Sequence, residues 1–203
     1  MPQRFGPDIF DRLRADPFGG RLTRGQIEGL DSVFGHWRCR PAGDPRHLAY
    51  MLATAFHETG HTMQPMRETG ATSDAAAIAR LEAAFAAGRL RQVKTPYWRP
   101  DPTGRSWFGR GLVQITHRRN YQRLSAAIGI DLVADPARAM EMAVAVRILF
   151  AGMEQGLFSG VTLSDVFNAT TEDWIGARRI VNGTDRAEKV AGYGRAFLAG
   201  ILG

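Results

Sequence analysis

The amino-acid sequence predicts a mainly α-helical fold with little β-structure, formed by a single domain over residues 1–203. Several segments repeat apolar residues at the helical period and begin with a residue that caps helices. The 203 residues are 44% hydrophobic, which is enough for one buried core with room for two lobes. No internal repeat, low-complexity tract or linker divides the chain.

The first two predicted helices have clear beginnings. Thr23 can cap a helix whose apolar positions are Ile27, Leu30, Phe34 and Trp37. Asp44 and Pro45 predict a second helix start, because Asp is a good N-cap and Pro suits the first helical position. The apolar residues of this helix are Leu48, Met51, Leu52, Ala55 and Phe56. It is expected to stop near Gly60.

The remaining elements follow in order. Ser73 and Asp74 open an alanine-rich helix that Gly88 ends. Residues 94–106 contain three prolines and are expected to form a loop. Residues 107–116 are the most strand-like segment, and they lead into a helix through Tyr121, Leu124 and Ile128. Further helices are predicted over 136–154, 164–167, 171–180 and 184–202.

Charge and composition limit the partners and the location. The net charge of +6 favours polyanions, which include nucleic acid, anionic cell-wall polymers and membrane surfaces. The longest apolar runs fall far short of the ~18 residues of a membrane span, so no stable membrane insertion is expected. The first residues lack the apolar run of roughly seven residues typical of a secretory signal, so a cytoplasmic location is expected until release. Cys39 is the only cysteine, which excludes an intramolecular disulfide and a cysteine-based zinc site.

Residues 55–70 contain a His-Glu-x-x-His pattern, which is typical of zinc hydrolases. Zinc binding needs His57 and His61 on one face of a helix that continues through the motif. Gly60 favours a helix end before His61. No clear third ligand follows, since Glu82 is a generic glutamate on a helix surface. A zinc hydrolase is therefore a distant alternative, and no metal is expected.

Two glutamates in the same segment suggest a different chemistry. Glu58 continues the apolar stripe of Leu48, Met51 and Ala55 along one helix face. A carboxyl group there is partly shielded from water, and desolvation favours the protonated form that a general acid needs. Glu68 lies beyond the helix, where the chain can fold back toward Glu58. Two carboxyls about 6.5–9.5 Å apart with a water between them are typical of an inverting glycosidase.

Each glutamate alone is more often a solvated surface charge, and the downstream sequence favours the catalytic interpretation of the pair. HETG is followed by a second acid, then by GRGLVQIT with NY close behind, and by IVNGTD near the end. In this order the motifs resemble the family 19 glycoside hydrolases, which include plant-type chitinases and a branch of phage endolysins. The resemblance is strongest over residues 48–203, and segments such as DLVADPARAM are similar to the phage and prophage branch. It implies a lysozyme-like α-helical domain with a catalytic cleft.

The resemblance also implies roles for individual residues. Glu58 matches the general acid, and Glu68 matches the general base that activates water. Substrate and water contacts are implied for Gln114, Thr116, Asn120 and Asn182. Lys189 stands where plant members have an arginine near the base, which keeps the charge but loses the bidentate fork. Trp107 and Phe108 replace a pair that contains tyrosine in plant chitinases, and they leave an aromatic wall for substrate.

The residue types agree with these roles. The glycines of the GRG motif permit close backbone approach, and Arg110 can order the loop or meet a carboxylate. Gln114 and Thr116 alternate with apolar residues, so in an extended segment their polar groups face one side. Four aromatic residues can stack on sugar rings or belong to the core: Tyr97, Trp98, Trp107 and Phe108. Arg178 and Arg179 are expected on a solvated face.

The combined prediction is an endolysin-type glycosidase that cleaves β-1,4 bonds of peptidoglycan with inversion, with chitin as the alternative substrate. No metal or organic cofactor is expected, because two carboxyls and a water suffice. A monomer that binds glycan strands is expected, and the resemblance implies release through a holin to the periplasm or cell wall. A nucleic-acid-binding module is disfavoured, because the basic residues are dispersed among 20 acidic ones. An inactive relative that only binds glycan is left open.

Overall fold

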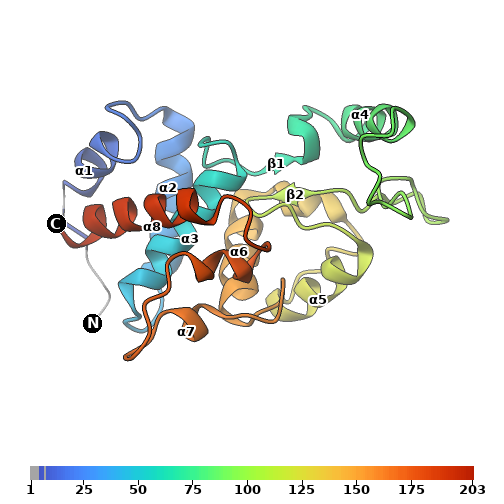
Figure 1. Ribbon diagram of the computed structural model, residues 1–203. Coiled ribbons are helices and arrows are strands. Elements are labelled where there is room, and N and C mark those ends of the chain that lie inside the picture. Colours follow the sequence, from blue (N-terminus) through green and yellow to red (C-terminus); the bar gives the residue numbers. More distant parts are fainter. Residues whose placement is uncertain (1–4, 7) are drawn as a thin grey trace.

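A computed structural model describes residues 5, 6 and 8–203 and has the predicted mainly α-helical fold (Figure 1). The α-helices are α1 (Ile9–Ala15), α2 (Arg24–Arg38), α3 (Pro45–Glu58), α4 (Asp74–Ala86), α5 (Arg118–Ile128), α6 (Met142–Glu154), α7 (Leu163–Val166) and α8 (Ala187–Leu202). Short 3-10 helices are η1 (Glu68–Gly70), η2 (Pro136–Met140) and η3 (Gly176–Ile180). The strands β1 (Met66–Arg67) and β2 (Arg110–Gly111) form the sheet of the described residues.

The predicted helix starts are confirmed by their capping hydrogen bonds. Thr23 accepts a hydrogen bond from the Gln26 N–H, and the Gln26 side chain returns one, which completes a capping box. The side chains of Asp44 and Ser73 accept backbone N–H groups in the first turns of α3 and α4. These side chains satisfy donors that a helix N-terminus leaves unpaired, so local chemistry fixes where α2, α3 and α4 begin.

The main core forms where α3 packs along α8, with α6 beside them (Figure 1). Every residue of α3 from Leu48 to Phe56 is buried, and α8 contributes Val190, Ala191 and Phe197. Gly194 of α8 allows the close approach, because an added Cβ would lie 2.6 Å from Cζ3 of Trp174. This packing holds the end of α3, and therefore Glu58, in one place.

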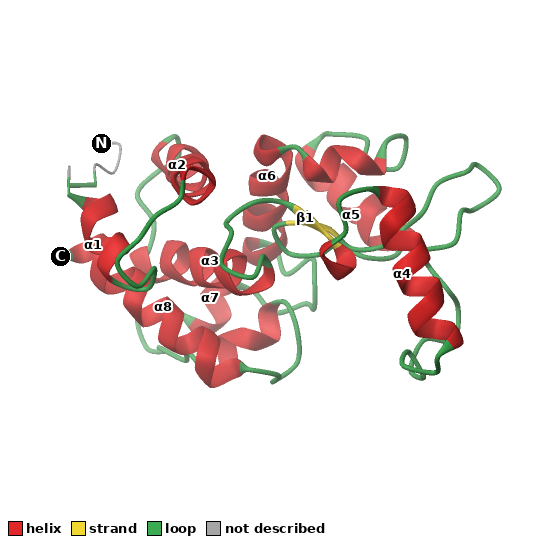
Figure 2. Cartoon of the chain, turned by 90° about the horizontal axis from the view of Figure 1, so that it is seen from above, coloured by secondary structure: helices red, strands yellow, loops and turns green. Residues whose placement is uncertain are grey.

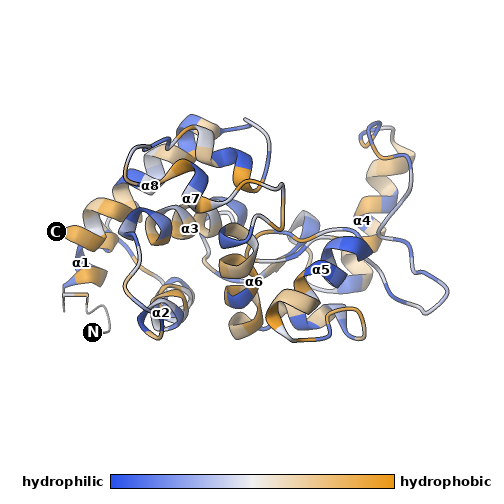
Figure 3. Ribbon diagram, turned by 90° about the horizontal axis from the view of Figure 1, so that it is seen from below, coloured by the Kyte–Doolittle hydropathy of each residue, from blue (hydrophilic) through white to orange (hydrophobic). Residues whose placement is uncertain are grey.

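A second, smaller hydrophobic cluster joins α4 to the loop that follows it. Its buried members are Ala71, Ala77, Leu81, Trp98 and Phe108. Figure 3 shows the apolar colouring along α4, which stands apart from α1, α2, α3 and α8. Seen from above, β1 lies between these two groups of helices (Figure 2). The region that follows Glu68 therefore has its own core and is joined to the rest near the strands.

Three predicted elements need correction. The strand-like segment 107–116 forms a strand only at Arg110–Gly111, because Gln114 has a left-handed φ of 50° and turns the chain back so that Arg110 bridges Ile115. The predicted helix 136–154 is divided at Glu141, which has an extended ψ of 127°. The predicted helix 171–180 is helical only in η3, because Glu172 forms a bridge with Phe167.

Helix α1 was not among the predicted elements. Its Leu13 packs close to α8, where an added Cβ at Gly200 would lie 2.6 Å from Cδ2 of Leu13. Within the part of the chain that the structure describes, no helix is both long enough and apolar enough to cross a membrane.

The contact at Gly194 gives a stability prediction. Gly194→Ala should lower the free energy of unfolding by about 1–3 kcal/mol, because the methyl group would overpack the Trp174 ring. Gly192 is the matched control on the same helix, since an added Cβ there meets nothing within 4 Å. Gly192→Ala should stabilise the protein by up to about 1 kcal/mol through helix propensity. Urea denaturation followed by circular dichroism measures both, and equal effects of the two substitutions would contradict the packing explanation.

Candidate active site

Glu58 is the last residue of α3, and the chain turns sharply behind it. The Thr59 hydroxyl donates to the Ala55 carbonyl at 2.7 Å, and the His61 N–H donates to the Phe56 carbonyl at 2.7 Å. Gly60 has a left-handed φ of 57°. The prediction that the helix ends before His61 is therefore confirmed.

The helix end separates the two histidines of the His-Glu-x-x-His pattern. His61 stacks flat on Phe56 with 4.0 Å between ring centroids, and its Nε2 lies 3.1 Å from the Tyr193 hydroxyl. Burial lowers the pKa of His61, so its ring is neutral near pH 7 and can accept this hydrogen bond. Among the described residues, no group of three or more His, Cys, Asp or Glu side chains could hold a metal ion. The geometry therefore lacks the helical face that a zinc site of this pattern requires.

Glu58 has a buried cation as its partner. Nη1 of Arg178 lies 2.7 Å from Oε1 of Glu58, and Nε of Arg178 donates to the Asp185 carbonyl at 3.0 Å. The side chain of Glu58 is 18% exposed, in agreement with the expected partial desolvation, whereas that of Arg178 is 3% exposed. The Glu58 carboxyl is therefore held by a guanidinium group that is itself almost fully buried.

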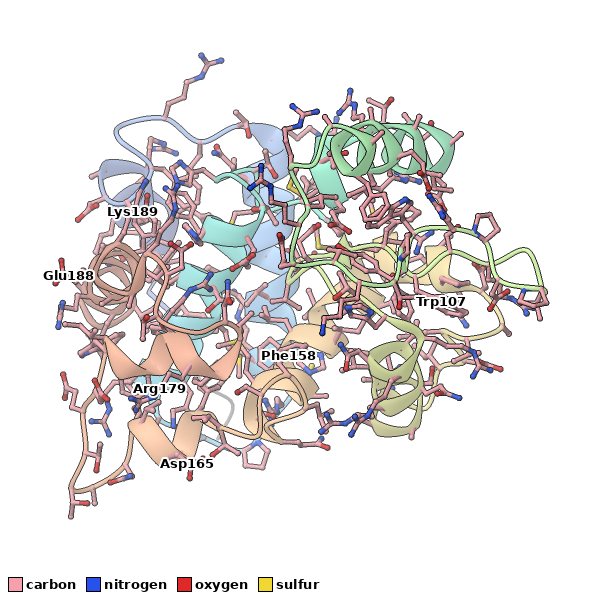
Figure 4. The ribbon with its side chains drawn as sticks, turned by 45° about the vertical axis from the view of Figure 1, so that its right-hand side comes forward. Trp107, Phe158, Asp165, Arg179, Glu188 and Lys189 are labelled. Carbon is pink, nitrogen blue, oxygen red and sulfur yellow. The ribbon has the colours of Figure 1, made fainter. Side chains whose placement is uncertain are left out.

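The prediction of a solvated face was wrong for Arg178. Residues of η3 turn Arg178 inward to Glu58, whereas the neighbouring Arg179 is 56% exposed and reaches Asp173 at 3.5 Å. Figure 4 labels Arg179 on its short helix. No local sequence signal marks this difference, because Glu58 and Arg178 are 120 positions apart.

Glu68 follows β1 directly and is fixed against the chain before β2. The strands are antiparallel, with Met66 opposite Gly111 and Arg67 opposite Arg110. The Glu68 N–H donates to the Gly109 carbonyl at 2.7 Å, and the Gly109 N–H donates to Oε2 of Glu68 at 2.7 Å. Both the backbone and the carboxylate of Glu68 are therefore held by one residue.

A second hydrogen-bond donor contacts the other carboxylate oxygen of Glu68. The Tyr97 hydroxyl donates to Oε1 of Glu68 at 2.7 Å. Burial raises the pKa of Tyr97, and the bonded Glu68 carboxylate raises it further. The phenol therefore stays protonated and donates. Tyr97 was predicted only as a possible sugar-stacking or core aromatic, so this role was missed.

The side chains of Gln114 and Glu68 both approach Gly109. A Cβ added to Gly109 would lie 2.9 Å from Oε1 of Gln114 and 3.3 Å from Oε2 of Glu68. The Gln114 amide donates to the Met66 carbonyl at 2.8 Å. The expected need for glycine at position 109 therefore has a physical cause, which is the close approach of these two side chains.

Thr116 and Asn120 are brought together at the start of α5. The Asn120 amide donates to the Thr116 carbonyl at 2.8 Å, and both residues are half-buried. Arg110 is buried, and it donates to Asp74 at 2.6 Å. The prediction that Arg110 orders the loop or meets a carboxylate is confirmed by this ion pair.

The aromatic wall predicted from Trp107 and Phe108 is contradicted by their burial. Trp107 is 5% exposed, and its indole N–H donates to Asp101 at 3.2 Å. Phe108 is fully buried, and the guanidinium carbon of Arg110 lies 3.6 Å from its ring centroid. Both rings support the loop from within and present no surface on which a sugar could stack.

Asn182 and Lys189 are both exposed. The Asn182 side chain accepts the Gly183 N–H at 2.9 Å. Figure 4 shows Lys189 on α8, on the opposite side of the molecule from Trp107. The Lys189 charge acts on His57 and His61, which flank Glu58. The ammonium group of Lys189 lies 5.8 Å from the Tyr193 ring centroid, and the position of Lys189 near the base stays a prediction. The cation that pairs with a candidate catalytic carboxylate is Arg178.

Two comparisons with known proteins found similarity to chitinases. A family model described as class I chitinase, glycoside hydrolase family 19, matches residues 40–194. Chitinase C from Streptomyces griseus HUT6037 is similar in structure, with a TM-score of 0.51 and 18% identity over 97% of this chain and 92% of that chain. A mutant of chitinase C gives a TM-score of 0.48 and 17% identity over 96% and 92%. A search of the curated proteins found no match.

The similarity to chitinase C from Streptomyces griseus HUT6037 supports the mainly α-helical fold. The family match covers most of the chain and includes both glutamates, the GRG motif and Arg178. This chain therefore belongs to glycoside hydrolase family 19, the class I chitinase family, and is a glycoside hydrolase that acts on glycans.

Proposed function

We propose that this glycoside hydrolase is an endolysin-type enzyme that cleaves β-1,4 bonds of peptidoglycan with inversion. The observation that carries the chemistry is the contrast between its two carboxyls. Glu58 is partly buried beside one guanidinium, and Glu68 accepts hydrogen bonds from a phenol and a backbone N–H. Paired carboxyls in different environments support separate acid and base roles.

In this proposal Glu68 is the base. Its two donors hold the Glu68 carboxylate in one orientation, from which it can take a proton from water. Glu58 is the acid that protonates the leaving oxygen. Proton donation turns Glu58 into a carboxylate beside Arg178, so the guanidinium stabilises the charge that develops during the reaction.

The charge of the chain supports the choice of substrate. Peptidoglycan carries carboxylates on its stem peptides, whereas chitin is uncharged. A net charge of +6 favours the anionic polymer at long range. In this role the enzyme acts as a monomer on glycan strands, and it passes from the cytoplasm to the wall when a holin opens the inner membrane.

A chitinase is the second candidate. The description of the matched family and the name of the Streptomyces griseus protein favour it. Both candidates use the same two carboxyls, so substrate preference must be measured.

Digestion of purified peptidoglycan tests the proposed function. We expect new reducing ends on N-acetylhexosamine residues, identified by mass spectrometry after borohydride reduction, and no new peptide termini. Chitin oligomers treated in parallel measure the alternative. Cleavage of chitin with no release from peptidoglycan would reject the endolysin proposal and leave the family assignment unchanged.

Glu58→Gln tests the acid. An amide has nearly the same volume but cannot protonate the leaving oxygen, so turnover should fall by about 10²–10⁴-fold. Circular dichroism should show a folded protein, with some loss of thermal stability because the buried Arg178 loses its counter-charge. A variant that keeps more than about a tenth of the wild-type rate would remove Glu58 from this role.

Glu68→Ala tests the base through chemical rescue. The substitution should abolish turnover and leave the Tyr97 hydroxyl and the Gly109 N–H directed at a space that formate can fill. Added formate should then restore part of the hydrolysis, and NMR should show the α-anomer first, as inversion requires. Glu68→Ala combined with Tyr97→Phe should be restored less, because one donor for formate is missing. Near-normal rates of the single variant would move the base elsewhere.

A further inference from the structure

A pocket of about 490 Å³ lies one side chain away from Glu68. It is lined by Gln92, Val93, Lys94, Thr95, Tyr97 and His117. Tyr97 joins it to the candidate active site, because the same residue that lines the pocket donates its hydroxyl to Oε1 of Glu68 at 2.7 Å. A substituent of the bound glycan that enters this pocket would therefore lie close to the bond that is cleaved.

The walls of this pocket are held together by the backbone of Trp107. The Trp107 N–H donates to the Tyr97 carbonyl at 3.0 Å, and the His117 N–H donates to the Trp107 carbonyl at 2.8 Å. The rings of Tyr97 and His117 are in contact, with centroids 4.4 Å apart. His117 has a positive φ of 63°. The pocket is therefore built by the same segment that supports Gly109.

The residues that line the pocket carry positive charge and no negative charge. Lys94 is exposed, and none of the six lining residues is acidic. Lys94 makes no ion pair among the described residues, although many arginines of the chain do. The chain has only two lysines, Lys94 and Lys189. Val93 and the Tyr97 ring add apolar surface beside this unpaired cation.

We propose that this pocket binds the substituent on O3 of N-acetylmuramic acid, with Lys94 paired to a carboxylate of the lactyl-peptide group. The inference rests on the proposed function, because it assumes that peptidoglycan is the substrate. The apolar wall suits the methyl groups of the lactyl and alanyl units, and the ammonium group suits the carboxylates that follow. An unsubstituted chitin strand has neither group, so the pocket distinguishes the two polymers.

The first test compares binding and turnover of matched variants. Lys94→Gln should lower kcat/KM on soluble peptide-bearing peptidoglycan oligomers by about fivefold, as expected for a partly exposed ion pair. Lys94→Arg should keep most of the activity. Arg89→Gln is the control, since it removes an exposed cation nearby that does not line the pocket. Affinity for an N-acetylglucosamine oligomer, measured by calorimetry in the Glu58→Gln background, should be unchanged by Lys94→Gln.

The outcomes separate this inference from the proposed function. If the wild-type protein cleaves chitin but not peptidoglycan, the proposed function fails, and the inference fails with it. If peptidoglycan is cleaved and Lys94→Gln behaves as Arg89→Gln does, only the pocket assignment fails. An equal loss of affinity for both oligomers would also overturn it, because Lys94 would then contact the sugar backbone.

Amine labelling supplies a second measurement that needs no substitution at Lys94. With only two lysines, a digest and mass spectrometry can follow Lys94 separately from Lys189. In the Glu58→Gln protein, peptide-bearing oligomers should slow acetylation of Lys94 by several-fold, and N-acetylglucosamine oligomers should not. Protection by both ligands, or by neither, would contradict the assignment.

Discussion

The contact between Glu68 and Gly109 is the constraint on which one half of the site depends. Two hydrogen bonds join these residues, and the short β1–β2 pairing continues from them. A side chain at position 109 would collide with Gln114 and press on Glu68. Arg110 then fixes this chain segment to α4 through Asp74. The attachment of the α4 region and the orientation of Glu68 therefore share one cause.

The other half of the site depends on helix packing. Glu58 ends α3, whose buried length lies along α8, and Arg178 approaches from η3. A buried ion pair of this kind adds little net stability, because desolvation offsets much of the attraction. It does restrict the Glu58 carboxyl to one orientation. The two glutamates are thus positioned by different means, one by helix packing with a cation and the other by strand pairing with neutral donors.

The parts of this structure that local chemistry determines could be predicted from the sequence. Thr23, Asp44 and Ser73 cap helices through bonds to residues two or three positions away, and Gly60 ends α3 as expected. The contacts that were missed join distant positions. Arg178 meets Glu58 across 120 positions, and a pair of adjacent arginines carries no sign of which one is buried. The prediction of a strand over residues 107–116 was wrong for most of its length. Alternation of residue types cannot reveal the left-handed backbone of Gln114.

Trp107 and Phe108 are buried, so the residues that choose the substrate are different from these two aromatic residues. Aromatic residues near a sugar site suggest stacking, yet these two form the interior that carries Gly109 and the pocket walls. Three of the lining residues, Gln92, Lys94 and Thr95, are exposed in the loop after α4, whereas Val93 packs against the second hydrophobic cluster. Substitutions there can alter the substituent that is accepted, while Glu58 and Glu68 keep their partners. Substrate range can therefore change within one fold without disturbing the acid and the base.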